Sequence, residues 1–186
     1  MAPSLRSAPV AFLAAGHGTD NAEFTHAWQA VLARDGQPVL VSPARLEIEL
    51  MSTVHRAVRA PVDIAAPDAS AVSFAGLVLP GGIDSADRLR AQSSAVAFVR
   101  GFFAAGLPVA AMCRAARVLI QADVLRQRRV ASWPSMRNDL RDAGAIWVAD
   151  HVVICDDGPN ALITCRGRAN LPLFCDIFTR KFSRSA

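Results

Sequence analysis

The sequence predicts an α/β protein, a three-layer α/β/α sandwich in which helices cover both faces of a mainly parallel sheet. Short apolar runs alternate with amphipathic stretches along the whole chain, as in successive strand–helix units. One apolar run ends directly at Cys113, and an amphipathic stretch follows it without a loop. A strand that turns into a helix at one residue forms a strained corner, the nucleophile elbow. The same pattern therefore predicts both the fold class and a candidate site.

The first half of the chain is expected to supply strands on either side of a first helix. Residues 9–15 are an apolar run, and residues 21–34 follow as an amphipathic helix that stops before Gly36. A second strand is predicted at 38–42, and alternating apolar and polar residues within 45–66 predict a side hairpin. The apolar run 76–80 predicts a buried strand that two glycines close.

The second half contains the candidate elbow. Residues 85–105 are predicted to form one long helix that Gly106 stops. A strand at 109–112 leads into Cys113 and a helix to about residue 122. The remaining elements are predicted as a strand at 130–133, a helix at 135–142, strands at 146–148, 152–155 and 161–165, and a helix at 169–182. In such folds ligands bind outside the carboxyl ends of the strands, where the segment 16–20, the two glycines and Cys113 should converge.

Length and composition limit the function classes. The 186 residues suit a single domain over 1–186, and 52% hydrophobic with 19% charged residues excludes a disordered chain. The apolar runs are far short of a membrane span, and the residues before Val10 make a poor export signal, so a cytoplasmic protein is expected. The net charge of +4 is modest and spread along the chain, so we expect no nucleic-acid partner.

The cysteine pattern argues against a metal site. The chain has four cysteines without CxxC spacing or zinc-type histidine pairing: Cys113, Cys155, Cys165 and Cys175. No dinucleotide fingerprint is present, because the glycines at 16 and 18 lack the third glycine and the later acidic residue. We therefore expect free thiols, no metal and no cofactor.

Cys113 has two interpretations. As a thiol at a helix N-terminus it is expected to have a lowered pKa and to act as a nucleophile. Alternatively, it is one more small buried hydrophobic residue, as free cysteines often are.

Several motifs together resemble the ThiJ/PfpI superfamily, whose members are related to class I glutamine amidotransferase domains. They cover nearly the whole chain in the same order: Val10-Ala-Phe-Leu, Gly36 through Val41-Ser42-Pro43, Leu77-Val-Leu-Pro-Gly-Gly82, Gly106-Leu-Pro-Val-Ala-Ala-Met-Cys113, Gln121-Ala-Asp-Val-Leu125, Ser132-Trp-Pro-Ser-Met-Arg-Asn-Asp-Leu140, Ala143-Gly-Ala-Ile-Trp-Val148 and Ile163-Thr-Cys-Arg-Gly167. The resemblance implies a flavodoxin-like sandwich, a homodimer, and a reactive elbow cysteine with an acidic residue nearby.

Glu23 is the candidate for that acidic residue, with Asp20 as the alternative. A protonated carboxyl next to the thiolate would hydrogen-bond to it and tune its oxidation. Glu23 is equally compatible with an ordinary first-turn glutamate that interacts with the helix dipole.

The sequence departs from the family pattern directly after the cysteine. Many hydrolytic and carbonyl-processing members have Cys-His-Gly, where this chain has Cys113-Arg114-Ala115. Arginine cannot serve as a base, so Arg114 is expected to stabilise the thiolate or to hold a substrate carboxylate or phosphate. The alternative is an Arg114 in solvent or in a dimer salt bridge. His17 is a candidate replacement base, or only a histidine in a turn.

Gly81 and Gly82 are expected to serve an oxyanion hole. The N–H of Gly82 and the N–H after the cysteine would converge on a developing negative charge. A tight turn after the strand is the structural alternative, and the two interpretations are compatible.

Two functions remain open. The leading one is a cysteine-dependent enzyme acting on a small electrophilic carbonyl compound, which is glyoxalase- or deglycase-like, a hydrolase or a lyase. The alternative is a non-catalytic, redox-responsive stress protein in which Cys113 is oxidised. In both cases a homodimer is expected, with Phe24 and Trp28 of the first helix as candidate contacts.

Overall fold

A computed structural model describes residues 5, 8–52 and 57–183. At its centre lies a seven-stranded sheet with the order β11-β12-β8-β7-β1-β3-β6. All neighbouring strands are parallel except β11, which is antiparallel to β12. The strands are β1 (Val10–Leu13), β3 (Pro38–Ser42), β6 (Ile64–Ala65), β7 (Gly76–Leu79), β8 (Val109–Met112), β11 (Val152–Cys155) and β12 (Leu162–Cys165).

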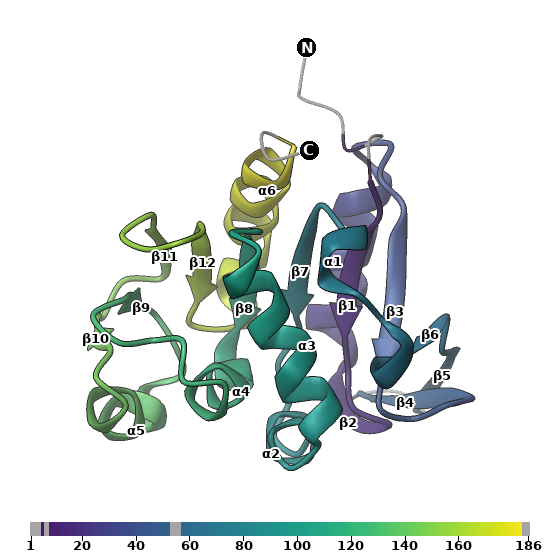
Figure 1. Cartoon of the computed structure of the whole chain (residues 1–186), viewed down its shortest axis with the longest axis horizontal. Helices are drawn as coiled ribbons and strands as arrows, with labels where there is room; N and C mark the ends of the chain where they lie inside the picture. Colours follow the sequence, from purple (N-terminus) through teal and green to yellow (C-terminus); the bar gives the residue numbers. More distant parts are fainter. Residues whose placement is uncertain (1–4, 6–7, 53–56, 184–186) are drawn as a thin grey trace.

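The four strands β1, β7, β8 and β12 are buried along their whole length. This explains why they appear in the sequence as continuous apolar runs rather than as alternating patterns. Helices α1 (Asn21–Leu32) and α6 (Leu171–Phe182) pack against each other and cover one face of the sheet. Helices α2 (Ser85–Arg90), α3 (Ser93–Ala104) and α4 (Ala116–Gln121) lie together over the other face (Figure 1). The predicted three-layer α/β/α sandwich is confirmed.

Phe24 is part of the core and not of an exposed helix face. It is 6% exposed and stacks on Trp28 with ring centroids 5.1 Å apart, while both rings also contact Phe12. Phe24 is therefore unavailable as a dimer contact, which corrects the expectation for this residue.

The predicted side hairpin is present as β4 (Glu47–Met51) and β5 (Val58–Pro61), which pair antiparallel. The segment predicted as a loop after the first strand is instead a third strand of this side sheet, β2 (His17–Asp20). It pairs with β4 in parallel and its register shifts between His17 and Thr19. Gly18 lies at that shift with φ +87, a conformation that glycine adopts without steric cost. Residues 17–20 therefore form a strand because their backbone pairs with the edge of β4.

The single long helix predicted at 85–105 is wrong, because Gln92 is extended (φ −103, ψ 111) and separates α2 from α3. Leu89 and Val96, seven residues apart, are both buried, so their spacing also fits one continuous helix. The apolar pattern therefore runs through the break without marking it.

The last third of the chain contains shorter elements than predicted. The strands β9 (Arg129–Val130) and β10 (Ile146–Trp147) pair only with each other, in parallel, outside the main sheet. Helix α5 (Arg137–Asp142) follows a 3-10 turn at Pro134–Met136, and a second 3-10 turn at Arg168–Asn170 precedes α6.

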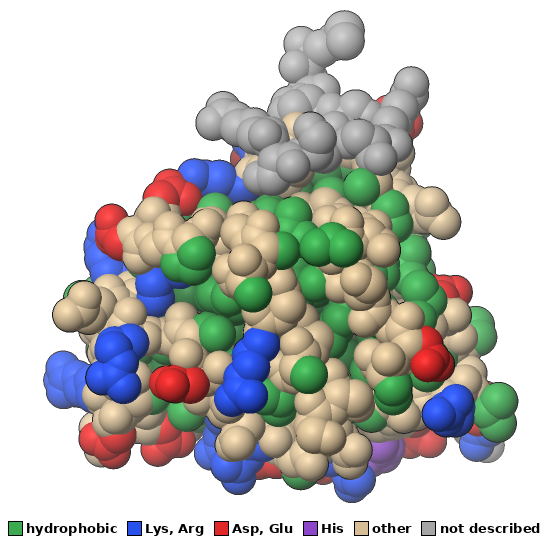
Figure 2. All heavy atoms as spheres, in the orientation of Figure 1, with side chains coloured by type: hydrophobic (Ala, Val, Ile, Leu, Met, Phe, Trp, Pro, Cys, Tyr) green, Lys and Arg blue, Asp and Glu red, His purple; other side chains and the backbone are tan. Residues whose placement is uncertain are grey.

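The surface carries charges of both signs. In Figure 2, Lys and Arg side chains are interspersed with Asp and Glu, and several lie along the lower edge of the view. Within residues 5, 8–52 and 57–183, no helix is long and apolar enough to cross a membrane. The same residues contain no group of three or more His, Cys, Asp or Glu side chains placed to hold a metal ion.

Candidate active site

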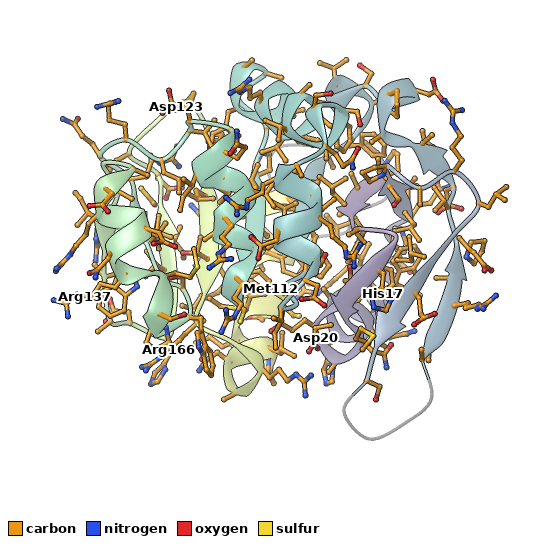
Figure 3. All side chains as sticks on the ribbon, turned by 90° about the horizontal axis from the view of Figure 1, so that it is seen from below. His17, Asp20, Met112, Asp123, Arg137 and Arg166 are labelled. Atoms are coloured by element: carbon orange, nitrogen blue, oxygen red, sulfur yellow. The ribbon has the colours of Figure 1, made fainter. Side chains whose placement is uncertain are left out.

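Cys113 lies at a sharp corner between β8 and the following helical segment. Its φ is +54, a left-handed conformation that costs a non-glycine residue about 1 kcal/mol or more. The 3-10 turn Cys113–Ala115 continues directly into α4. The elbow predicted from the sequence is confirmed, and Cys113 is the one cysteine of the four that is not fully buried. Met112, the last residue of β8 and the one before Cys113, is labelled in Figure 3.

Glu23 lies in the first turn of α1 and is 2% exposed. Its Oε2 accepts a hydrogen bond from the backbone N–H of Gly81 at 2.8 Å. Burial raises the pKa of the Glu23 carboxyl to about 7, and the charge of Asp20 adds to the rise. The Gly81 N–H and the Arg168 guanidinium act in the opposite direction but are weaker. Around neutral pH this carboxyl is therefore poised to hold or release a proton.

Gly81 leaves the space that Glu23 and Cys113 share. A Cβ added to Gly81 would collide with Glu23 Oε2 and would lie 3.0 Å from Cys113 Cβ. Both side chains therefore border the same small volume above the glycine. Because the Gly81 N–H is already bonded to Glu23, it is not free to bind an oxyanion, so the expectation for Gly81 is corrected: it positions the carboxyl.

The lowered pKa predicted for the Cys113 thiol is wrong. Burial, and after it the neighbouring Glu23 charge, raise this pKa to about 12 against the lowering influence of the Arg114 N–H and guanidinium. The dipole expected at this position is weak, because α4 has only six residues and starts three residues later. Accessibility rather than acidity distinguishes Cys113 from the other thiols.

A cavity of about 530 Å³ opens beside the cysteine. Its residues come from the segments that follow the sheet strands, from the first turn of α1 and from the turn before β11: Asp20, Glu23, Gly82, Ile83, Cys113, Arg114, Trp133, His151, Arg166, Gly167, Arg168, Ala169 and Asn170. Asp20 caps α1 by accepting the Glu23 N–H at 3.0 Å, and its other oxygen pairs with Arg168. Asp20 is therefore occupied, and Glu23 is the acidic side chain next to the thiol.

The structure brings Cys113, Glu23, Gly82 and Arg114 together around this cavity, but not His17. His17 borders a separate cavity with Pro43 and Asp84, and its Nδ1 lies 3.3 Å from Glu49 Oε1 in the side sheet. Figure 3 shows His17 on the far side of Asp20 from Arg166. A catalytic base at His17 is therefore not supported by the geometry.

Sequence reasoning passed over five residues of this cavity: Ile83, His151, Arg168, Ala169 and Asn170. His151 lines the cavity from the turn before β11. For Arg168 a signal existed, because Arg166 and Arg168 directly follow the buried strand that lies next to β8. Residues just past the carboxyl end of a strand adjacent to the elbow belong to the same edge of the sheet.

Comparison with known proteins gives consistent matches. A family model described as the DJ-1/PfpI family matches residues 8–181. An uncharacterized protein of Archaeoglobus fulgidus is 37% identical over 144 residues, which are 77% of this chain and 81% of that protein. A protein named deglycase PYRAB04690, from Pyrococcus abyssi, is 40% identical over 93 residues, 50% of this chain and 55% of the relative. General stress protein 18 of Bacillus subtilis is 36% identical over 113 residues, 61% of this chain and 63% of the relative.

The fold has matches among solved structures as well. A two-domain protein of Anabaena variabilis, with dj-1/thij/pfpi-like and ferritin-like domains, superposes with a TM-score of 0.83 at 26% identity. The superposition covers 92% of this chain and 47% of that longer chain. The match with the named deglycase spans little more than half of that relative.

Proposed function

The chain belongs to the DJ-1/PfpI family, and on this basis we propose that it is a cysteine-dependent enzyme acting on a small electrophilic carbonyl compound. The observation that carries the proposal is the shared space of Cys113 and Glu23 above Gly81, at the edge of a cavity of about 530 Å³. A nucleophile and a proton-transfer group at one end of a concave pocket are the minimum for carbonyl addition.

The first step is addition of the Cys113 sulfur to the carbonyl carbon. The new C–S bond forms while the carbonyl π pair moves onto oxygen, and the S–H proton reaches that oxygen by way of the Glu23 carboxyl. The backbone N–H groups of Gly82 and Arg114 are the donors for the developing oxyanion. A carboxyl with a pKa of about 7 suits this transfer, since it can give and accept a proton near neutral pH.

With an α-oxoaldehyde the adduct can be resolved without an external oxidant. Glu23 removes the hydrogen of the hemithioacetal carbon as a proton and returns it to the adjacent carbonyl carbon, while the proton of the hemithioacetal hydroxyl passes to the adjacent carbonyl oxygen. The first carbon is thereby oxidised to a thioester and the second is reduced to an alcohol. Water then cleaves the thioester, which releases a 2-hydroxy acid and the Cys113 thiol. The relatives named deglycase support this class of substrate.

A substrate screen tests the proposal. Wild type, Cys113→Ala and Glu23→Gln are incubated with methylglyoxal and with a methylglyoxal-modified amine, and product and covalent adduct are followed by mass spectrometry. We expect turnover and an adduct on Cys113 in wild type, and neither in Cys113→Ala. Cys175→Ala is the matched control, because Cys175 is buried away from this cavity. Equal turnover in wild type and Cys113→Ala contradicts the proposal.

A second candidate is a redox-responsive stress protein without turnover. Its specific support is the relative named general stress protein 18, together with a buried carboxyl beside the one accessible thiol. Peroxide would oxidise Cys113 to the sulfinate, which a protonated Glu23 would hydrogen-bond. A stoichiometric gain of two oxygen atoms on Cys113, with no turnover of any aldehyde, favours this candidate over the enzyme.

A further inference from the structure

The cavity beside Cys113 is rich in positive charge. Arg114, Arg166 and Arg168 line it, whereas its acidic side chains are Asp20 and Glu23. Asp20 is neutralised by its pair with Arg168. Glu23 is nearly buried and bonded to the Gly81 N–H. The cavity therefore keeps an excess of positive charge.

Arg114 and Arg166 are the source of that excess. Both are only partly exposed, and within residues 5, 8–52 and 57–183 neither guanidinium forms an ion pair with a carboxylate. Several arginines elsewhere in the described residues are paired, for example Arg117 with Asp87 at 2.7 Å. Two half-buried guanidinium groups without a carboxylate, facing one cavity, favour an anionic ligand.

The two arginines flank the thiol from different elements. Arg114 follows Cys113 in the elbow, and its charge acts directly on the Cys113 sulfur. Arg166 comes directly after β12, the parallel neighbour of β8 in the sheet. Trp133 and Ile83 are 44% and 70% exposed and add apolar surface to the same cavity. The cavity thus offers a nucleophile, an apolar wall and two planar cations.

We propose that the carbonyl substrate of this site carries a carboxylate or phosphate group, which Arg114 and Arg166 hold while its carbonyl carbon faces Cys113. This inference rests on the proposed enzymatic function for its meaning in catalysis, but the anion preference of the cavity stands on the geometry alone. Arginine matches both anions because its planar fork donates two parallel hydrogen bonds. In this site, arginine in place of the more common family histidine selects the substrate and does not transfer protons.

Alkylation of Cys113 tests the anion preference without requiring turnover. Iodoacetate and iodoacetamide differ mainly in charge, and both transfer a carbon to the thiolate while iodide leaves. The ratio of their rate constants at Cys113 is compared with the ratio for 2-mercaptoethanol, using Cys113→Ala to subtract labelling elsewhere. We expect the wild-type ratio to exceed that of the free thiol by about tenfold, the scale of one charge-assisted contact, and to fall with salt.

Variants separate the two arginines from the overall charge. Arg114→Ala and Arg166→Ala should each lower the ratio of the iodoacetate to the iodoacetamide rate constant, and the double variant should bring it to the free-thiol value. Arg114→Lys should keep part of the excess over the free thiol, because the charge remains while the planar guanidinium is lost. Arg88→Ala is the matched control, since it removes one positive charge from the separate cavity that His17 borders. Circular dichroism verifies that each variant is folded. A wild-type ratio equal to that of 2-mercaptoethanol, or one that both arginine variants leave unchanged, overturns the inference.

Turnover then connects the preference to catalysis. The anionic α-oxoaldehyde 4,5-dioxopentanoate is compared with neutral 2-oxopentanal, and hydroxypyruvaldehyde phosphate distinguishes phosphate from carboxylate. We expect a higher kcat/KM for one of the two anionic aldehydes than for 2-oxopentanal. Arg114→Ala and Arg114→His should lose that advantage, so that the ratio of kcat/KM for the anionic aldehyde to kcat/KM for 2-oxopentanal falls toward one; the ratio cancels any effect of the lost charge on the thiol itself. If no aldehyde is turned over, the proposed function fails while the alkylation ratio still decides the anion site. If only the neutral aldehyde is turned over, the inference fails and the proposed function stands.

Discussion

The backbone N–H of Gly81 donates a hydrogen bond to Glu23 Oε2 at 2.8 Å, and this contact joins the end of β7 to the first turn of α1. The bond holds a buried carboxyl beside Cys113. Gly81 therefore supplies both the hydrogen-bond donor for Glu23 and the space between Glu23 and Cys113. A side chain at position 81, or a change in the protonation of Glu23, should alter the surroundings of the Cys113 thiol.

Gly81→Ala is expected to disturb both the fold and the site. Its methyl group would collide with Glu23 Oε2 and crowd Cys113 Cβ and the Met112 carbonyl oxygen, each at 3.0 Å. Overpacking of this kind costs about 1–3 kcal/mol, measured by urea unfolding. Gly167→Ala is the control from the same cavity, because its Cβ would meet only the Trp133 ring, at 3.7 Å. A Gly81→Ala protein as stable as the control contradicts the packing described for Glu23.

Stability should fall as pH rises from 4.5 to about 7. The pKa of Glu23 is raised from 4.5 to about 7 in the folded protein, so between these values the folded state binds more protons than the unfolded state. The full difference corresponds to about 3 kcal/mol as an upper limit, at about 1.4 kcal/mol per tenfold change in acidity. Above pH 7 both states have lost the proton and this contribution no longer changes.

Glu23→Gln identifies the source of that dependence. The amide cannot ionise, so the variant should gain stability relative to wild type as pH rises from 5 to 8. Urea unfolding of both proteins at each pH measures the gain. Parallel profiles for the two proteins would assign the pH dependence to groups other than Glu23.

His17→Ala should leave the chemistry of Cys113 unchanged. The imidazole interacts with Glu49 at 3.3 Å in a partly exposed position and borders a separate cavity. Loss of such a contact costs less than about 1 kcal/mol. Iodoacetamide labelling of Cys113 and turnover of the best aldehyde should stay within about twofold of wild type. A loss of turnover as large as that of Glu23→Gln would restore His17 as a candidate base.

A homodimer stays a prediction, and the structure shifts its expected surface from Phe24 to the side hairpin. Leu46, Met51 and Val58 are 84%, 41% and 45% exposed there, which is unusual for large apolar side chains grouped on one hairpin. Light scattering should give twice the 19.8 kDa of one chain, and Leu46→Glu should give the monomer. Val72→Glu, at an exposed apolar residue on another segment, should remain dimeric. A monomeric wild type at micromolar concentration would rule out this dimer.

The elbow was predictable because its cause is local. The apolar run 109–112, a cysteine and an immediate amphipathic stretch determine the corner without reference to the rest of the chain. The helix break at Gln92 was not, since neither glycine nor proline marks it and the helical spacing of buried residues continues from Leu89 to Val96.

The candidate site shows the same division. Which residues meet at the sheet edge follows from the strand ends, so Cys113 and Gly82 could be placed from the sequence. The position of His17 depends on pairing between β2 and β4, and the roles of Asp20 and Glu23 depend on which carboxylate Arg168 engages. The thiol pKa depends on burial, a tertiary property that helix-terminus reasoning does not contain.

Glu23→Gln should speed alkylation of Cys113 above neutral pH. With a thiol pKa of about 12, the wild-type rate with iodoacetamide should rise nearly tenfold per pH unit from 8 to 10, without a plateau. The ionised Glu23 carboxylate contributes to that high pKa by repelling the thiolate. Removing its charge should raise the rate at pH 9 by about three- to tenfold. Below pH 6, where the wild-type carboxyl already carries its proton, the two rates should converge.

Peptide mapping assigns the label, with Cys113→Ala as the blank. A Glu23→Gln rate below that of wild type at pH 9 would contradict this prediction. It would mean that the ionised carboxylate promotes alkylation instead of repelling the thiolate.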